Sequence, residues 1–191
     1  KFISTILSIS LNSLNLNVYP EMWISLHMIQ LDAIMHIIST LKLHIEEKFT
    51  IDEAFNFQLW EKYFNLSFQM LKYEHLNLNS FSQNKKNFVL EKYGDIRLLI
   101  IKELESSWFV LSDRQKTRFT SMMVPFLFYV LDLEKDIFKE FALNVYYDAL
   151  CVEYREHNNF ATVERYTIDE LYDVSDRSQE AGKKFVLQLE E

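Results

Sequence analysis

Glycine, proline and cysteine are all scarce in this chain: 2 Gly, 2 Pro and 1 Cys in 191 residues. So few turn-forming residues argue against a β-sandwich or barrel. The single Cys151 excludes an intrachain disulfide, which is typical of a cytosolic protein. Basic residues number 20 against 28 acidic ones, for a net charge of -8. The densest basic pair is Lys85–Lys86. We expect these two lysines to lie on the solvated surface rather than to contact acidic lipid. A nucleic-acid partner is therefore not expected.

Apolar residues are abundant: 49% of the chain is hydrophobic and 15% aromatic. Apolar positions recur with a period near 3.6 residues, which predicts roughly eight or nine helices with short connections. The predicted fold class is all-α, an armadillo- or HEAT-like superhelix of stacked antiparallel helix pairs, with a closed helical bundle as the alternative. We expect residues 1–191 to be a single helical-repeat segment of a longer protein. The uncharged stretch Phe2–Pro20 is too polar for a membrane span.

The predicted core follows from apolar residues on one helical face. A helix over about Phe55–Tyr73 is apolar on two neighbouring stripes, so we expect an inner helix with Trp60, Phe64 and Phe68 buried. The other core stripes are Ile3, Ile6, Leu7, Leu11 and Leu14; Ile24, Met28, Leu31, Ile34, Met35, Ile38, Leu41 and Ile45; Ile96, Ile100, Leu104 and Trp108; and Ile137, Phe141, Val145, Ala149 and Val152.

Several residues predict where helices begin. Pro20 suits a first helical turn, where its missing N–H costs nothing. "TIDE" at Thr50–Glu53 and "SDRQ" at Ser112–Gln115 have the spacing of a capping box. "TIDE" returns at Thr167–Glu170. Pro125 is expected to kink or interrupt its helix.

Gly94 lies between two apolar-periodic runs, in "EKYGDIR". A glycine can adopt positive φ without a Cβ penalty, so we predict that it closes a helix ending at Tyr93. Asp95 is then placed to cap the following helix.

No arrangement of reactive side chains is apparent. His27, His36 and His44 are nine and eight residues apart on one predicted helix and do not converge, so surface or boundary positions are favoured over a metal site. Cys151 and His157 point in opposed directions, which favours a buried, inert cysteine. Glycine-rich phosphate loops and the HExxH zinc motif are missing. We assign no catalytic, cofactor-binding or metal-binding residue, and no cofactor.

Four further segments are distinctive: "YPEMW" at Tyr19–Trp23, "LWEKYFNLSF" at Leu59–Phe68, "LNLNSFSQNKKNFVLEKYGDIR" at Leu76–Arg97 and "YYDALCVE" at Tyr146–Glu153. Together they resemble segments of the dedicator of cytokinesis (DOCK) family. The order and spacing agree from about Tyr19 to Leu171. The family tends to have Gly where Val124 stands, and it is Gly-rich and acidic after Glu170, where this chain is not.

The resemblance implies a helical scaffold within a guanine-nucleotide exchange factor for Rac and Cdc42 GTPases. It places the segment between a lipid-binding region and a C-terminal exchange region, with residues 172–191 as a lead-in to the latter. The segment itself is then not an enzyme. Implied partners of the parent are a Rho-family GTPase, an ELMO-type adaptor and a second copy, in the cytoplasm with membrane recruitment through other regions. An unrelated peptide-binding helical-repeat adaptor is the alternative, and an enzyme of helical fold is third.

Overall fold

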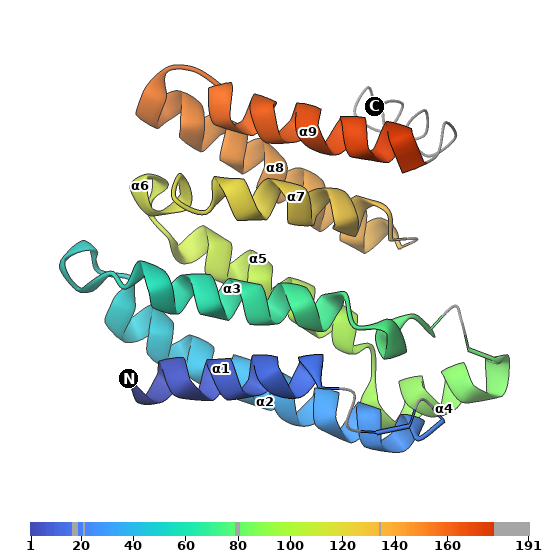
Figure 1. Cartoon of the computed structure of the whole chain (residues 1–191). Coiled ribbons are helices and arrows are strands. Elements are labelled where there is room, and N and C mark those ends of the chain that lie inside the picture. The colour runs from blue at the N-terminus through green and yellow to red at the C-terminus, as the bar shows by residue number, and fades with distance from the viewer. Residues whose placement is uncertain (17–18, 21, 79–80, 134, 178–191) are drawn as a thin grey trace. The chain divides into compact units, whose positions relative to one another are not determined.

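The computed structural model describes residues 1–16, 19–20, 22–78, 81–133 and 135–177, with side chains as far as residue 173 (Figure 1). Within these ranges the chain forms nine α-helices and two short 3-10 helices and contains no strand. The all-α prediction is thus confirmed. Most of the proposed lead-in, residues 178–191, lies outside the described residues. The chain divides into two compact units, residues 1–110 and residues 111–191.

Unit 1 (residues 1–110) is built around α3 (Phe57–Leu71), which packs against α1, α2 and α5. Within the unit α1 and α3 lie side by side in one layer, while α2 and α5 form the second layer (Figure 1). Trp60, Phe64 and Phe68 are all buried, so the predicted inner helix is confirmed. The remaining helices of the unit are α1 (Phe2–Asn15), α2 (Ile24–Phe49), α4 (Gln83–Tyr93) and α5 (Ile96–Val110), with 3-10 turns at Asp52–Ala54 and Glu74–Leu76.

Helix α2 is long and apolar enough to span a bilayer by length and composition alone, with a mean hydropathy of 1.3 over its most apolar window. Its predicted core stripe, from Ile24 to Ile45, is buried inside unit 1. A core helix passes the same length and composition test. Packing within the unit is thus sufficient to explain the hydropathy of α2.

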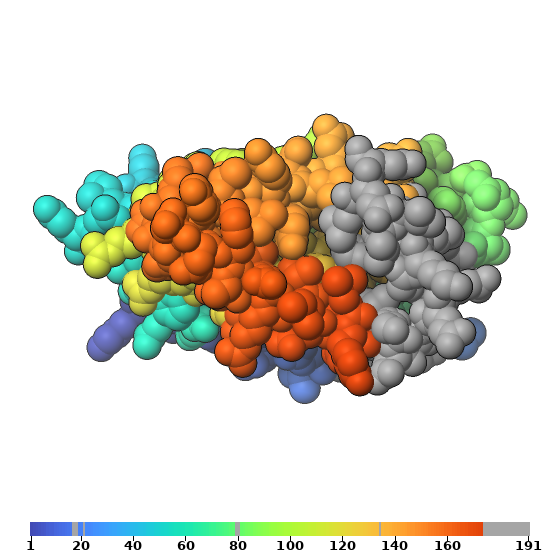
Figure 2. Space-filling model, turned by 90° about the horizontal axis from the view of Figure 1, so that it is seen from above, coloured from blue at the N-terminus to red at the C-terminus, as the bar shows by residue number. Residues whose placement is uncertain are grey.

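Unit 2 (residues 111–191) is built around α7 (Thr120–Leu131), which packs against both α8 (Asp136–His157) and α9 (Ala161–Arg177). Consecutive helices α7, α8 and α9 run antiparallel (Figure 1), and Figure 2 looks onto the outer surfaces of α8 and α9. The short α6 (Asp113–Lys116) packs against α8. These helix pairs are the predicted repeat unit.

Three details of unit 2 differ from the prediction. α7 continues through Pro125, so the interruption offered as one of two expectations for this proline does not occur, and the kink stays a prediction. The break falls at residues 117–119 instead, where the capping box at Ser112 has started a separate turn. Ile137 is 41% exposed, and its neighbour Phe138 takes the core position. The second "TIDE", Thr167–Glu170, lies inside α9 rather than at a helix start.

The corner between α4 and α5 matches the prediction. Gly94 ends α4 with φ 71° and ψ -166°, and its N–H donates to the Leu90 carbonyl at 3.0 Å. This region of backbone space is essentially reserved for glycine. Asp95 caps α5 through a long hydrogen bond, 3.4 Å from its Oδ1 to the Leu98 nitrogen.

Two predicted helix starts in unit 1 are wrong. Thr50 ends α2 rather than beginning α3, and the cap of α3 is Asn56, whose Oδ1 accepts from the Leu59 N–H at 3.1 Å. Pro20 lies outside α2, which begins at Ile24. Its carbonyl oxygen accepts a hydrogen bond from the Trp23 N–H at 2.9 Å. The proline therefore shapes the approach to the helix and not its first turn.

Candidate functional site

The three histidines of α2 occupy different surroundings. His27 is buried, contrary to the surface or boundary position expected for it. Its Nε2 lies 3.2 Å from the Pro20 carbonyl oxygen and its Nδ1 lies 3.1 Å from the Tyr73 hydroxyl. Because a carbonyl can only accept, Nε2 carries a proton and donates it to Pro20. Both ring nitrogens are thereby engaged. His36 and His44 are exposed and do not join this cluster.

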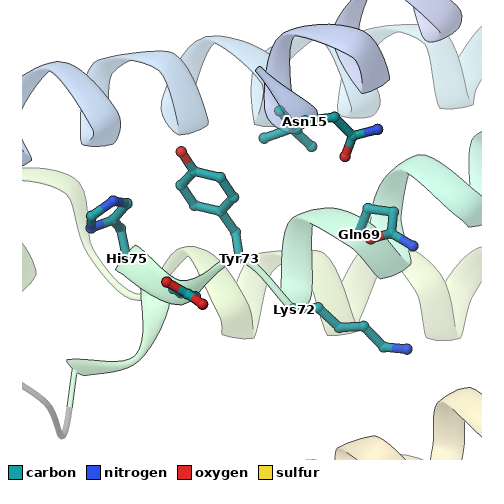
Figure 3. A pocket seen from close by; sticks show the side chains of 7 residues that line it. Asn15, Gln69, Lys72, Tyr73 and His75 are labelled. Atoms are coloured by element: carbon teal, nitrogen blue, oxygen red, sulfur yellow. The ribbon is translucent and has the colours of Figure 1, made fainter. Parts of the chain in front are cut away.

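The His27 ring also forms part of an aromatic cluster beside a small polar cavity. His75 stacks on His27 with a centroid distance of 3.8 Å, and Tyr19 meets the same ring edge-on at 5.7 Å. Figure 3 shows Tyr73 and His75 side by side, with the Lys72 side chain pointing away from them. The cavity, of about 240 Å³, is lined by Leu14, Asn15, Gln69, Lys72, Tyr73, Glu74 and His75.

A second depression lies between the start of α2 and α4, and its lining is mainly apolar. Met22 is 87% exposed, Trp23 56% and Phe88 45%. Lys85 contributes the only charge among the lining residues, which are Met22, Trp23, Ile24, Ser25, Leu26, Lys85 and Phe88. The volume is about 360 Å³. An exposed tryptophan beside an exposed phenylalanine and methionine is the composition of a binding surface rather than of a reaction centre.

The interior of unit 1 contains a polar network between α2, α3 and α5. The Tyr63 hydroxyl lies 3.0 Å from the Ser107 Oγ, which donates to Glu46 at 3.2 Å. Lys42 forms a 2.7 Å ion pair with Glu103. Burial raises the pKa of the Tyr63 phenol well above its ordinary value. The phenol is therefore held neutral as a hydrogen-bonding group, and the network joins helices.

Glu153 holds the α8–α9 corner of unit 2. Its two carboxylate oxygens accept from the backbone N–H groups of Thr162 and Val163 at 2.7 and 2.8 Å. These amides belong to the first turn of α9, where N–H groups lack helical partners and negative charge is favoured. Glu153 is only 2% exposed. Its carboxylate acts as a capping group supplied by the preceding helix.

Two further carboxylates attach α6 to α8. Lys116 forms a 2.7 Å ion pair with Asp148. Arg155 makes a two-pronged contact with Asp113, at 2.6 and 3.1 Å. The hydrogen bond from Arg155 lowers the pKa of the Asp113 carboxyl. Cys151, expected to be buried, is half-buried on the same helix, and His157 is exposed.

Several residues quoted for the DOCK resemblance form helix corners or contacts between structural elements. Gly94 turns the corner between α4 and α5, and the Trp60 Nε1–H donates to the Phe49 carbonyl at 3.0 Å. Asp148 and Glu153 attach α6 and α9 to α8. Over the part of the chain that the structure describes, no three His, Cys, Asp or Glu residues gather as a metal site. The described residues therefore define a helical-repeat module.

The chain belongs to the family described as the dedicator of cytokinesis (DOCK) TPR region, which matches residues 1–186. It is 26% identical to mouse dedicator of cytokinesis protein 3 over 171 aligned residues. These make up 90% of this chain and 8% of that protein. It is 28% identical over 153 residues to human dedicator of cytokinesis protein 4, covering 80% of this chain and 8% of the relative. No solved structure matches the chain. The chain thus spans about a twelfth of the length of these relatives.

Glu153 was missed as a capping residue by the sequence reasoning. The signal available was an acidic residue one helical turn before the Asn158–Asn159 break, facing the start of the next helix. That signal has meaning only once the turn between α8 and α9 is known, because the turn decides which amides the carboxylate reaches.

Proposed function

We propose that this chain is the helical scaffold of a Rho-family guanine-nucleotide exchange factor that acts on Rac or Cdc42, and that it connects a lipid-binding region to an exchange region. The observation that carries the proposal is that the residues quoted for the DOCK resemblance form helix corners, caps and core contacts. A scaffold acts through geometry, and these are the residues that fix geometry. Membership of the DOCK family favours this function over an unrelated adaptor.

The partners of the parent protein belong to the same proposal. A Rho-family GTPase would bind the exchange region of the parent. An ELMO-type adaptor and a second copy of the parent are further proposed partners. The parent would be cytoplasmic and recruited to the membrane through other regions. Neither a cofactor nor nucleic acid takes part in this scheme.

Release of fluorescent GDP from Rac and Cdc42 tests the proposal. The chain alone, the exchange region and the full-length parent are compared at equal concentration. We expect acceleration by the parent and the exchange region and none by the chain alone, because exchange requires groups that disturb the bound Mg²⁺ and phosphates. Deleting the chain from the parent should change its stability, dimerisation or regulation. Robust release by the chain alone, or no release by the parent across the Rho family, would contradict the proposal.

A further inference from the structure

The depression between α2 and α4 contains side chains that the core of unit 1 does not use. Met22, Trp23 and Phe88 expose 87%, 56% and 45% of their surfaces. They lie around one depression of about 360 Å³. Large exposed apolar groups gathered in one place mark interaction sites on protein surfaces. Tryptophan in particular is enriched among residues that dominate binding energy.

The α4 side of this depression carries charge opposite to that of the chain as a whole. Helix α4 carries Lys85, Lys86 and Lys92 against a single acidic residue, Glu91, whereas the chain has a net charge of -8. Lys85 lines the depression. The Lys92 ammonium lies 5.7 Å from the centroid of Phe88, within the range of a cation–π contact. The apolar centre is therefore bordered on its α4 side by positive charge.

Neither Lys85 nor Lys92 forms an ion pair with another described residue. Lys85 contacts the Phe81 ring, at 5.3 Å from its centroid, and Lys92 contacts Phe88 and Tyr93. A lysine that rests on an aromatic ring keeps donors available for a carboxylate. The arrangement is thus charge-complementary to an acidic ligand.

Two other occupants fit these observations less well. A second copy of the chain, related by a twofold axis, would bring two sets of lysines together across one interface. An anionic membrane would attract α4 but repel a chain of net charge -8, and stable electrostatic membrane binding takes about 4–8 clustered basic residues.

We propose that the depression formed by Met22, Trp23, Leu26, Phe88 and Lys85 docks an amphipathic helical segment of a partner protein, with apolar side chains at helical spacing and acidic residues on both flanks. The apolar stripe of the segment fills the depression beside Trp23 and Phe88. Its carboxylates pair with Lys85 and Lys92. This mode of helix-in-groove recognition uses residues three and four apart as anchors. The proposal does not depend on the exchange-factor assignment.

The test uses three fluorescein-labelled synthetic peptides of about 18 residues, or five helical turns. All three carry the same leucine and phenylalanine stripe at helical spacing, and their remaining positions are Glu, Gln or Lys. Binding to the 191-residue chain is followed by fluorescence anisotropy. We expect the Glu peptide to bind most tightly and the Lys peptide most weakly. Affinity for the Glu peptide should fall as salt is raised, because exposed charges are screened.

Matched variants locate the site. Trp23→Ser and the double variant Lys85→Glu with Lys92→Glu should each weaken binding of the Glu peptide by about tenfold or more. The double variant should also bind the Lys peptide more tightly than the unmodified chain does. In two control variants the affinity for the Glu peptide should stay within about twofold of that of the unmodified chain. These are Leu43→Ser, which removes an apolar residue of α2 that is 65% exposed, and Lys102→Glu on α5.

Several results would overturn the proposal. One is equal binding of the Glu and Lys peptides, or the absence of binding by any peptide. Another is an effect of Leu43→Ser as large as that of Trp23→Ser. Co-sedimentation with phosphatidylcholine vesicles containing phosphatidylserine, lost in the double lysine variant, would assign the surface to lipid instead. A dimer in analytical ultracentrifugation that Trp23→Ser dissociates would assign it to a second copy.

Discussion

Unit 1 and unit 2 share one plan, an apolar inner helix with helices packed on either side, but the polar contacts at the start of α3 in unit 1 differ in chemistry from those at the start of α9 and around α6 in unit 2. In unit 1, neutral groups hold the start of α3: the Asn56 amide oxygen accepts from the Leu59 N–H, and the Trp60 indole N–H donates to the Phe49 carbonyl. In unit 2, carboxylates do this work: Glu153 caps α9, and Asp148 attaches α6 to α8. The contrast shows that a repeat fold can keep its helix pairs while changing the bonds between them.

The difference has a physical consequence. Neutral hydrogen bonds respond little to salt or moderate acid, whereas bonds to ionised carboxylates are stronger but depend on the carboxylate remaining charged. The α9 cap and the α6–α8 contacts of unit 2 are therefore expected to be more sensitive to pH and ionic strength than the α3 contacts of unit 1. The following predictions test this contrast, beginning with the largest effect.

Replacing the central tryptophan of unit 1 should have the largest effect. Trp60 is fully buried, so Trp60→Ala should lower the free energy of unfolding by about 3–5 kcal/mol through cavity formation. Urea denaturation followed by circular dichroism measures this. Trp23→Ala is the matched control, because Trp23 is 56% exposed and its loss should cost less than about 1 kcal/mol. Equal costs would show that α3 is not the inner helix.

Removing the carboxylate of Glu153 should destabilise unit 2 by less. Glu153→Ala leaves the Thr162 and Val163 N–H groups without their acceptor, which should cost about 1–3 kcal/mol. Amide hydrogen exchange should accelerate in the first turn of α9. Glu153→Gln, with a single acceptor oxygen, should fall in between. The exposed Glu156 on the same helix serves as control, and an equal effect of Glu156→Ala would refute the capping role.

Replacing Gly94, the glycine at the α4–α5 corner of unit 1, should have a smaller effect on the free energy of unfolding. Gly94→Ala should cost about 1 kcal/mol or somewhat more, because φ 71° is unfavourable for an L-residue. An added Cβ would meet no atom within 4 Å, so the cost is purely one of backbone conformation. D-alanine introduced at residue 94 by chemical ligation prefers the mirror-image region and should restore stability. A D-alanine variant as unstable as the L-alanine one would disprove this account.

The smallest predicted effect is on the pH at which unit 2 unfolds in acid. The pKa of Asp113 is lower in the folded chain, so its contribution to stability is present above the unfolded value near 3.9 and is lost as pH falls through the folded value. Asp113→Asn should shift the acid midpoint upward by about a few tenths of a pH unit, because an exposed pair contributes little. Acid titration followed by hydrogen exchange in α6 and α8 measures the shift. An equal change in α3 would argue against a local effect.

The core could be predicted from the sequence because apolar residues at helical spacing mark the face of each helix that is buried. The stripes that contain Trp60, Ile38 and Trp108 are buried as predicted. Gly94 was predictable for a related reason: few residues other than glycine tolerate its backbone angles, so a rare glycine between two periodic runs has one main use.

Helix starts and polar contacts were less accessible. The "TIDE" spacing at Thr50 also fits a 3-10 turn, and Asn56 captures the α3 amides because it stands closer to the start of the apolar stripe. The burial of His27 depends on Tyr73, which is distant in sequence. The depression at Trp23 combines α2 and α4 in the same way. Contacts of this kind require the tertiary arrangement, which a local pattern does not contain.

The positions of the three tryptophans give the chain a built-in spectroscopic separation. Trp23, Trp60 and Trp108 all belong to unit 1, and the aromatic residues of unit 2 are tyrosines and phenylalanines. Indole emission on excitation at long wavelength therefore reports the unfolding of unit 1 alone, while far-ultraviolet dichroism reports both units. Where the two signals change together, the units unfold cooperatively, and where they separate, one unit melts independently of the other.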